Sequence, residues 1–178
     1  AVIATPAGSL GFTETGIGIF PGLGGMLRLA RFTSPDFAKY YVFTGTPITA
    51  QTAHELGIVT KLVRPAEVEV AIKELTAEGK PDKYQQRDLP EHLEPFAQAC
   101  RQDNVARLLS GNPPEGIPDE IAAKAAKFIG YKAPIALKMA NEIIDLQAGK
   151  SIEEAIEVEL DHCKEIFSTG DALLGLSN

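Results

Sequence analysis

Two pieces of the sequence decide the fold: GFTETGIGIFPGLGGMLRLARF over residues 11–32 and FTGTPITAQTAHELGIVTKLV over residues 43–63. Six of the ten residues from Gly16 to Gly25 are glycine or proline, which argues against a helix there. The periodic pattern that follows predicts a helix from Met26 to about Arg31. The first piece therefore predicts a glycine-rich loop that leads directly into a helix.

Several element boundaries are marked by capping residues. Ser34-Pro35-Asp36 combines an N-cap serine, a proline at the first helical position and an acidic residue in the first turn, so a helix is predicted from there to Gly45. Thr49 is predicted to cap a second helix that ends at Gly57. Short strands are expected at residues 2–4, 10–12 and 58–63.

After Pro65 the pattern is almost entirely helical. Helices are predicted over residues 66–78, 91–109, 118–129 and 134–146, with a loop over 79–90. A last helix follows the capping box Ser151–Glu154. Its apolar residues recur at spacings of three and four: Ile152, Ile156, Leu160, Cys163 and Phe167.

Composition excludes several classes of protein. The chain has 178 residues, 44% of them apolar and 23% charged, which fits one globular unit or part of a larger one. The net charge of −7 without a basic cluster argues against nucleic-acid binding. The longest apolar runs are far shorter than the roughly 18 residues of a membrane helix, so no membrane segment is expected.

The cysteines and histidines show no spacing typical of a metal site. Cys100 and Cys163 are predicted to be reduced, which indicates a cytoplasmic protein. No zinc or other metal site is expected, because His54, His92 and His162 are scattered along the chain.

Glu14 is the candidate acid–base residue. A lone glutamate is usually a solvated surface residue, and that interpretation stays open. Thr13, Thr15 and the apolar residues that follow would partly desolvate a carboxylate at this position, which suits general acid–base chemistry.

The loop Gly22–Gly25 has two interpretations. The glycines either supply a tight turn that needs positive φ, or expose backbone N–H groups to a ligand at the start of a helix. A Walker loop is excluded because no Gly-Lys-Ser/Thr follows. A dinucleotide fingerprint is excluded because Phe20-Pro21 stand where its third glycine is needed.

Taken in order, these pieces resemble the enoyl-CoA hydratase/isomerase (crotonase) family. Its pattern has a glutamate, an I-P-G-x-G-G loop, an R-L-x-R helix and a T-G-x-x-I-x-A-x-x-A-x-x-x-G-L-V segment, which residues 11–63 follow without gaps. Residues 134–138 and 167–171 are similar to the end of the same family. Thr13 and Met26-Leu27 depart from the pattern and leave the acyl specificity open.

The resemblance implies an α/β fold of the crotonase/ClpP-like spiral type, of which this chain would form the C-terminal part. It would be mostly helical with a few short strands. Residues 1–65 would end the spiral core and carry the glycine loop. Residues 66–178 would form a helical region for oligomerisation and for covering the active site.

The resemblance also implies a site. Glu14 would exchange a proton with the acyl chain or with the water added to it, and Gly22, Phe20 and Pro21 would line the substrate site. The substrate would be an acyl-CoA thioester, so coenzyme A is part of the substrate and no cofactor is expected. The implied assembly is a homo-oligomer, a trimer or hexamer.

In the family, a second glutamate and both oxyanion-hole N–H groups come from segments before those matched here. We therefore expect the C-terminal part of a 2-enoyl-CoA hydratase, of the kind used in fatty-acid β-oxidation, that is inactive alone. A fused 3-hydroxyacyl-CoA dehydrogenase upstream is one possible origin. Isomerisation, thioester hydrolysis and a non-catalytic oligomerisation fragment stay open. A G-G-G-x-E-like stretch upstream would favour hydration, and an apolar residue replacing its glutamate would favour isomerisation.

Overall fold

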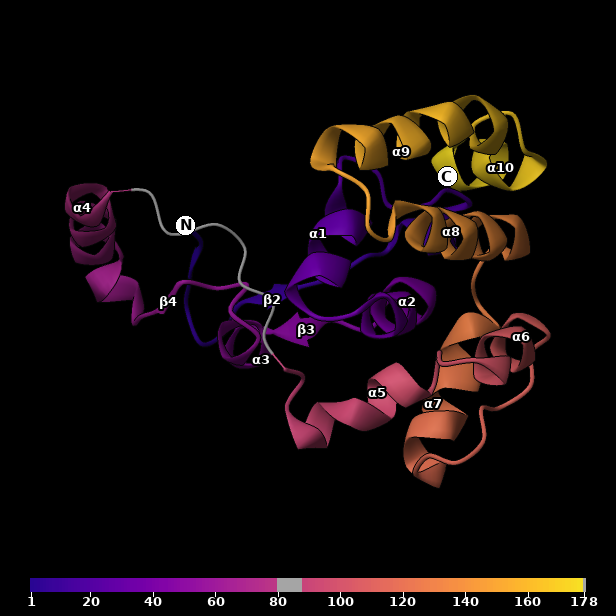
Figure 1. Ribbon diagram of the computed structural model, residues 1–178, viewed down its shortest axis with the longest axis horizontal. Coiled ribbons are helices and arrows are strands. Elements are labelled where there is room, and N and C mark those ends of the chain that lie inside the picture. Colours follow the sequence, from indigo (N-terminus) through magenta and orange to yellow (C-terminus); the bar gives the residue numbers. More distant parts are fainter. Residues whose placement is uncertain (80–87, 178) are drawn as a thin grey trace.

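The computed structural model describes residues 1–79 and 88–177 (Figure 1). The strands in these ranges are short: β1 Ile3–Ala4, β2 Ser9–Leu10, β3 Ile48–Thr49 and β4 Lys61–Leu62. β1 pairs in parallel with β4, and β2 pairs antiparallel with β3. The predicted strand at residues 2–4 is confirmed as β1, and the strand expected at 10–12 lies slightly earlier as β2.

Helices make up most of the described chain. The α-helices are α1 Gly25–Phe32, α2 Pro35–Thr44, α3 Ala50–Glu55, α4 Val68–Glu78, α5 Glu94–Gln98, α6 Asp103–Leu109, α7 Asp119–Ile129, α8 Pro134–Gln147, α9 Ile152–Ile166 and α10 Gly170–Ser177. Short 3-10 helices are η1 Glu14–Ile17, η2 Pro65–Glu67 and η3 Glu91–Leu93. A mostly helical chain with a few short strands is therefore confirmed.

Helix α2 lies at the centre of the core, where every residue from Phe37 to Thr44 is buried. It packs against α1, α5, α7 and α8. Both ends are set by the predicted signals. Ser34 Oγ accepts a hydrogen bond from the Phe37 N–H at 3.2 Å, and Gly45 ends the helix with a φ of +66°, which glycine adopts without strain.

The arrangement in space brings the C-terminal helices to the glycine-rich segment. α4 lies beside β4 at one end of the long axis, whereas α6 and α7 lie at the other end (Figure 1). α9 runs along α8, and α10 packs against η1. An element far away in sequence, α10, therefore lies against the segment that begins at Glu14.

The prediction of a single helix over residues 91–109 is wrong. The structure has η3, α5 and α6 there, and Gln102 between α5 and α6 has a positive φ of +51°, which is uncommon for a residue other than glycine. Asn104 closes this break, because its Nδ2 donates to Gln98 O and to Glu115 O, each at 2.9 Å.

Other boundaries shift by a few residues. The strand expected over 58–63 is confined to β4, because the Val59 N–H turns back to donate to Ala53 O at 3.0 Å. The helix expected from residue 66 starts at Val68 after η2. The first residues of the loop expected over 16–25 belong to η1. Residues 80–87 of the loop expected over 79–90 lie outside the described residues.

Candidate active site

Glu14 opens η1, directly before the glycine loop. Its side chain is half-buried, and its Oε2 is enclosed without a hydrogen-bond partner among the described residues. Native proteins seldom leave a buried carboxylate oxygen unsatisfied, so such an atom is a candidate for contact with a ligand or water. The structure therefore supplies an available carboxylate at the predicted position.

The backbone around Glu14 is held from two sides. Thr15 is fully buried, and its Oγ1 donates to Val42 O of α2 at 3.2 Å. The Ala133 N–H, just before α8, donates to Thr15 O at 2.9 Å. Since neither bond uses the Glu14 side chain, η1 is fixed to the core while the carboxylate stays available.

The three other predicted site residues have different environments. Phe20 and Pro21 are buried, and Phe20 belongs to the main hydrophobic core. Gly22 is exposed, and a Cβ added to it would meet no atom within 4 Å. Open space therefore adjoins the backbone at Gly22, whereas Phe20 and Pro21 support the loop from inside.

The tip of the glycine loop has an unusual backbone. Leu23 and Gly24 have φ angles of +58° and +72°, and the Leu23 side chain is 97% exposed. Positive φ is unfavourable for leucine, and residues strained in this way concentrate at functional sites. Arg28 Nη1 donates to Leu23 O at 2.6 Å, so α1 supports the loop that precedes it.

A residue that the sequence did not indicate contacts this loop. Glu159 of α9 is 3% exposed, and its Oε2 accepts the Gly24 N–H at 2.8 Å. The available signal was weak: Glu159 shares the buried face of α9 with Ala155 and Ile166, where an apolar residue is normally expected. The contact spans 135 residues, so helical periodicity could not identify its partner.

Four further polar side chains on α1 and α9 bond to backbone carbonyls. Arg28 contacts the glycine loop, and Arg31 Nη2 donates to Lys150 O at 2.6 Å. His162 Nδ1 contacts Val158 O at 2.7 Å, while Cys163 Sγ donates to Glu159 O at 3.3 Å. Each of the last two bonds to the preceding turn of its own helix.

Cys100 is a buried free thiol and Cys163 a half-buried one. Burial raises the pKa of the Cys100 thiol. Within residues 1–79 and 88–177, no group of three or more His, Cys, Asp or Glu side chains is arranged to hold a metal ion. In the same ranges, no helix combines the length and apolar character needed to cross a membrane.

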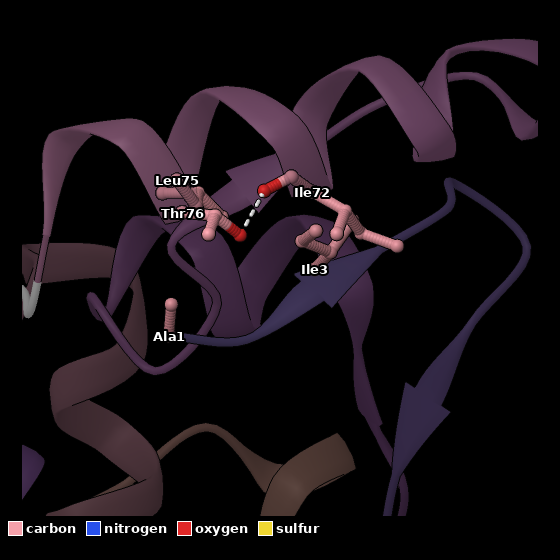
Figure 2. Close-up of a pocket in the computed structure, with 5 residues that line it drawn as sticks. All are labelled: Ala1, Ile3, Ile72, Leu75 and Thr76. Carbon is pink, nitrogen blue, oxygen red and sulfur yellow. Dashed lines mark hydrogen bonds between the residues drawn. The ribbon is translucent and has the colours of Figure 1, made fainter.

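Figure 2 shows a surface pocket between β1 and α4, lined by Ala1, Ile3, Ile72, Leu75 and Thr76. Thr76 Oγ1 donates to Ile72 O at 2.7 Å. None of the lining side chains carries a charge. It shares no residue with the segment from Glu14 to Gly24.

Comparisons with known proteins bear on this geometry. Residues 1–178 match the family described as enoyl-CoA hydratase/isomerase. The crotonyl-CoA hydratase of Syntrophomonas wolfei is 38% identical over 73 residues, 41% of this chain and 28% of the relative. The mitochondrial 3-hydroxyisobutyryl-CoA hydrolase of Xenopus laevis is 26% identical over 162 residues, 82% of this chain and 42% of the relative.

The fold also matches that of solved structures. A carnitinyl-CoA dehydratase from Mycobacterium thermoresistibile superposes with a TM-score of 0.75 at 21% identity, over 99% of this chain and 54% of that one. An enoyl-CoA hydratase from Rhodobacter sphaeroides gives a TM-score of 0.73 at 24% identity, over 98% and 52% respectively. The chain thus spans about half the length of these structures, and less of the curated relatives.

Proposed function

Because the chain belongs to the enoyl-CoA hydratase/isomerase family and has the α/β crotonase fold, we propose that its protein hydrates 2-enoyl-CoA thioesters. Glu14 would be one of two acid–base carboxylates. The observation that carries this assignment is its enclosed Oε2, unpartnered among the described residues, at the start of a segment leading to the open backbone of Gly22.

Hydration defines what Glu14 has to do. The water oxygen bonds to one carbon of the double bond, a proton is added to the other, and the water loses a proton. A carboxylate can accept the proton from water, and a carboxylic acid can supply the one that reaches carbon. We propose that Glu14 performs one of these transfers, with Gly22 and the neighbouring Phe20 and Pro21 forming part of the substrate site.

The remaining catalytic groups would come from elsewhere in the protein. The thioester oxygen gains negative charge during the reaction, and losing one donor to such an oxyanion costs about 10²–10³ in rate. We propose that residues 1–178 alone are therefore inactive. Turnover by this chain alone in the usual range of about 1–10³ s⁻¹ would contradict that proposal.

Thioester hydrolysis is a second candidate with its own support. The match to a 3-hydroxyisobutyryl-CoA hydrolase extends over 162 residues, whereas the match to the crotonyl-CoA hydratase covers 73. In hydrolysis, Glu14 would activate the water that attacks the thioester carbonyl. Double-bond isomerisation also uses one proton-transfer group and remains a further alternative, as does a non-catalytic role in assembly.

The decisive experiment assays the protein from which this chain comes against three substrate classes. Crotonyl-CoA reports hydration by loss of its absorbance, a 3-enoyl-CoA reports isomerisation, and a 3-hydroxyacyl-CoA reports hydrolysis by release of free thiol. We expect hydration to be fastest. Thiol release faster than hydration would replace the first proposal with the second.

We also propose a homo-oligomer, a trimer or hexamer, in the cytoplasm. Several large apolar side chains on α9 and the residues after it are exposed, among them Leu160, Phe167, Leu173 and Leu176. Apolar surface gathered in this way is typical of a subunit contact. The division into residues 1–65 and 66–178, and a fused 3-hydroxyacyl-CoA dehydrogenase, remain predictions.

A further inference from the structure

Glu159 connects two parts of the molecule through its two carboxylate oxygens. Oε2 accepts the Gly24 N–H of the glycine loop at 2.8 Å, and Oε1 accepts from Gln147 Nε2 of α8 at 3.0 Å. The same Gln147 nitrogen donates to Ala155 O of α9 at 2.9 Å. Both Glu159 and Gln147 are buried, so solvent does not compete for these bonds.

A carboxylate at this depth needs an explanation. Removing such a group from water is unfavourable unless hydrogen bonds compensate. The two donors described for Glu159 are a backbone amide and a side-chain amide, both uncharged. An apolar residue would fill this position of α9 more simply, so the carboxylate is best explained by what it holds.

The peptide unit between Leu23 and Gly24 is held at both of its polar groups. Its N–H donates to Glu159 Oε2, and its C=O accepts from Arg28 Nη1 at 2.6 Å. Because a peptide unit is planar, fixing both groups fixes the orientation of the whole plane. Hydrogen bonds to charged side chains are roughly twice as strong as neutral ones.

These two hydrogen bonds, from Gly24 N–H to Glu159 and from Arg28 to Leu23 O, form a clamp on the strained part of the loop. Leu23 has a φ of +58°, a conformation that leucine does not prefer, and it directly follows Gly22. The turn is also closed by the Gly25 N–H, which donates to Gly22 O at 3.2 Å. Without the two bonds to Glu159 and Arg28, the Leu23–Gly24 plane would be less restrained against rotation toward a relaxed conformation, and the Gly22 backbone would shift with it.

We propose that Glu159 is a positioning residue: with Arg28 it locks the Leu23–Gly24 peptide plane and so keeps the backbone of Gly22 in place beside the acyl group. This inference rests on the proposed function of the Glu14–Gly22 segment. Glu159 touches no reacting atom. Its effect reaches the substrate through the glycine loop.

The test uses the full-length protein and a readout that is independent of activity. Hydrogen exchange of the Gly24 amide measures the clamp directly, because that amide is the donor to Glu159. Glu159→Ala should accelerate exchange at Gly24 at least about tenfold. Glu159→Gln should preserve most of the protection, because its side-chain oxygen still accepts the Gly24 N–H, although its amino group then stands opposite the Gln147 Nε2 donor and that one bond is lost.

Measurements of kcat and KM then distinguish a positioning role of Glu159 from a purely structural one. Glu159→Ala should lower kcat at least about tenfold with a smaller change in KM, and Glu159→Gln should restore most of the loss. The exposed Glu157 lies on the same helix, so Glu157→Ala is the matched control and should change neither Gly24 exchange nor kcat. If Glu159→Ala does not fold, Arg28→Met, which removes the other half of the clamp from an exposed position, replaces it.

The outcomes are distinguishable. Unchanged Gly24 exchange in Glu159→Ala, or in Arg28→Met as its replacement, overturns the clamp. Faster exchange with unchanged kcat overturns the positioning role, provided that Glu14→Gln abolishes activity in the same assay. If Glu14→Gln leaves activity intact, the proposed function fails, and Gly24 exchange still decides whether Glu159 holds the loop.

Discussion

Lys39 of α2 donates to Asp145 of α8, with 2.6 Å between Nζ and Oδ1, and the two side chains are 6% and 56% exposed. The pair thus joins the central helix to α8 with one member buried and the other in contact with water. Asp145→Asn should lower the free energy of unfolding by about 1–3 kcal/mol, because it leaves a buried ammonium without its charged partner.

Chemical denaturation measures this loss. Lys39→Met removes the charge that needs a partner and should cost less than Asp145→Asn. Glu142→Gln changes an exposed carboxylate on the same helix and should stay within about 0.5 kcal/mol of the parent protein. Equal effects of Asp145→Asn and Glu142→Gln would show that the ion pair contributes nothing.

Two glycines of α10 provide a second prediction. A Cβ on Gly175 would overlap the carbonyl of Ile17 in η1, whereas a Cβ on Gly170 would meet no atom within 4 Å. Gly175→Ala should therefore push α10 away from η1 and cost about 1–3 kcal/mol of stability. Gly170→Ala in the same helix should be neutral, or stabilising by up to about 1 kcal/mol. Comparable losses in both variants would contradict the close approach of α10 to η1.

Glu14→Gln tests the acid–base assignment in the full-length protein. It keeps the shape of the side chain and removes the group that transfers a proton, so kcat should fall by at least about 10²-fold. The melting temperature should change little, because Glu14 Oε2 has no partner to lose among the described residues. Glu120→Gln, on an exposed face of α7, is the control. A parental kcat in Glu14→Gln would show that Glu14 transfers no proton in the reaction.

The aromatic pair in α2 predicts a dependence of stability on alkaline pH. Burial raises the pKa of Tyr41 from 10.0 to about 12. Burial and its neighbour Tyr41 also raise the pKa of Tyr40. Above pH 10 the unfolded chain loses these protons before the folded one, so it binds fewer protons and stability falls as pH rises toward the folded-state pKa.

Denaturant unfolding between pH 9 and 12 checks this dependence. Tyr41→Phe should lose less stability than the parent over this window, with a difference of at most about 2–3 kcal/mol from a two-unit shift. Tyr131→Phe, which changes a tyrosine that is 71% exposed, should follow the parent curve. If Tyr41→Phe lost as much stability as the parent protein between pH 9 and 12, the effect of burial on Tyr41 would be refuted.

The helix ends that are marked by local capping residues could be predicted from the sequence. Ser34 and Ser151 each cap a helix by accepting a backbone N–H three residues ahead, and both caps are observed. Such signals work because donor and acceptor are close in the chain. The break at Gln102 escaped prediction because a glutamine with positive φ has no compositional marker, and because the break is closed by side-chain contacts of Asn104 with Gln98 O and Glu115 O that periodicity does not reveal.

The candidate site was predictable only in part, for the same reason. Glu14 and the glycine loop lie within one short segment, and their order along the chain indicated a site. Glu159 reaches that loop from 135 residues away, so only the folded structure reveals its contact with Gly24. The apolar stripe of α9 marked a helix correctly, but Leu160 and Phe167 on it are exposed while the buried face carries Ala155 and Glu159.

The pairing of β1 with β4 has a consequence for the order of assembly. The Val2 N–H donates to Thr60 Oγ1 across 58 residues, and each strand contributes only two residues to the ladder. Closing a chain segment of that length has an entropic cost that two residue pairs barely offset, whereas α1 and α2 meet through a short turn. We therefore expect the helical core to form early, with β1 docking late and detaching early. Since α4 contacts β1, we expect the two elements to unfold locally together, as one cooperative unit.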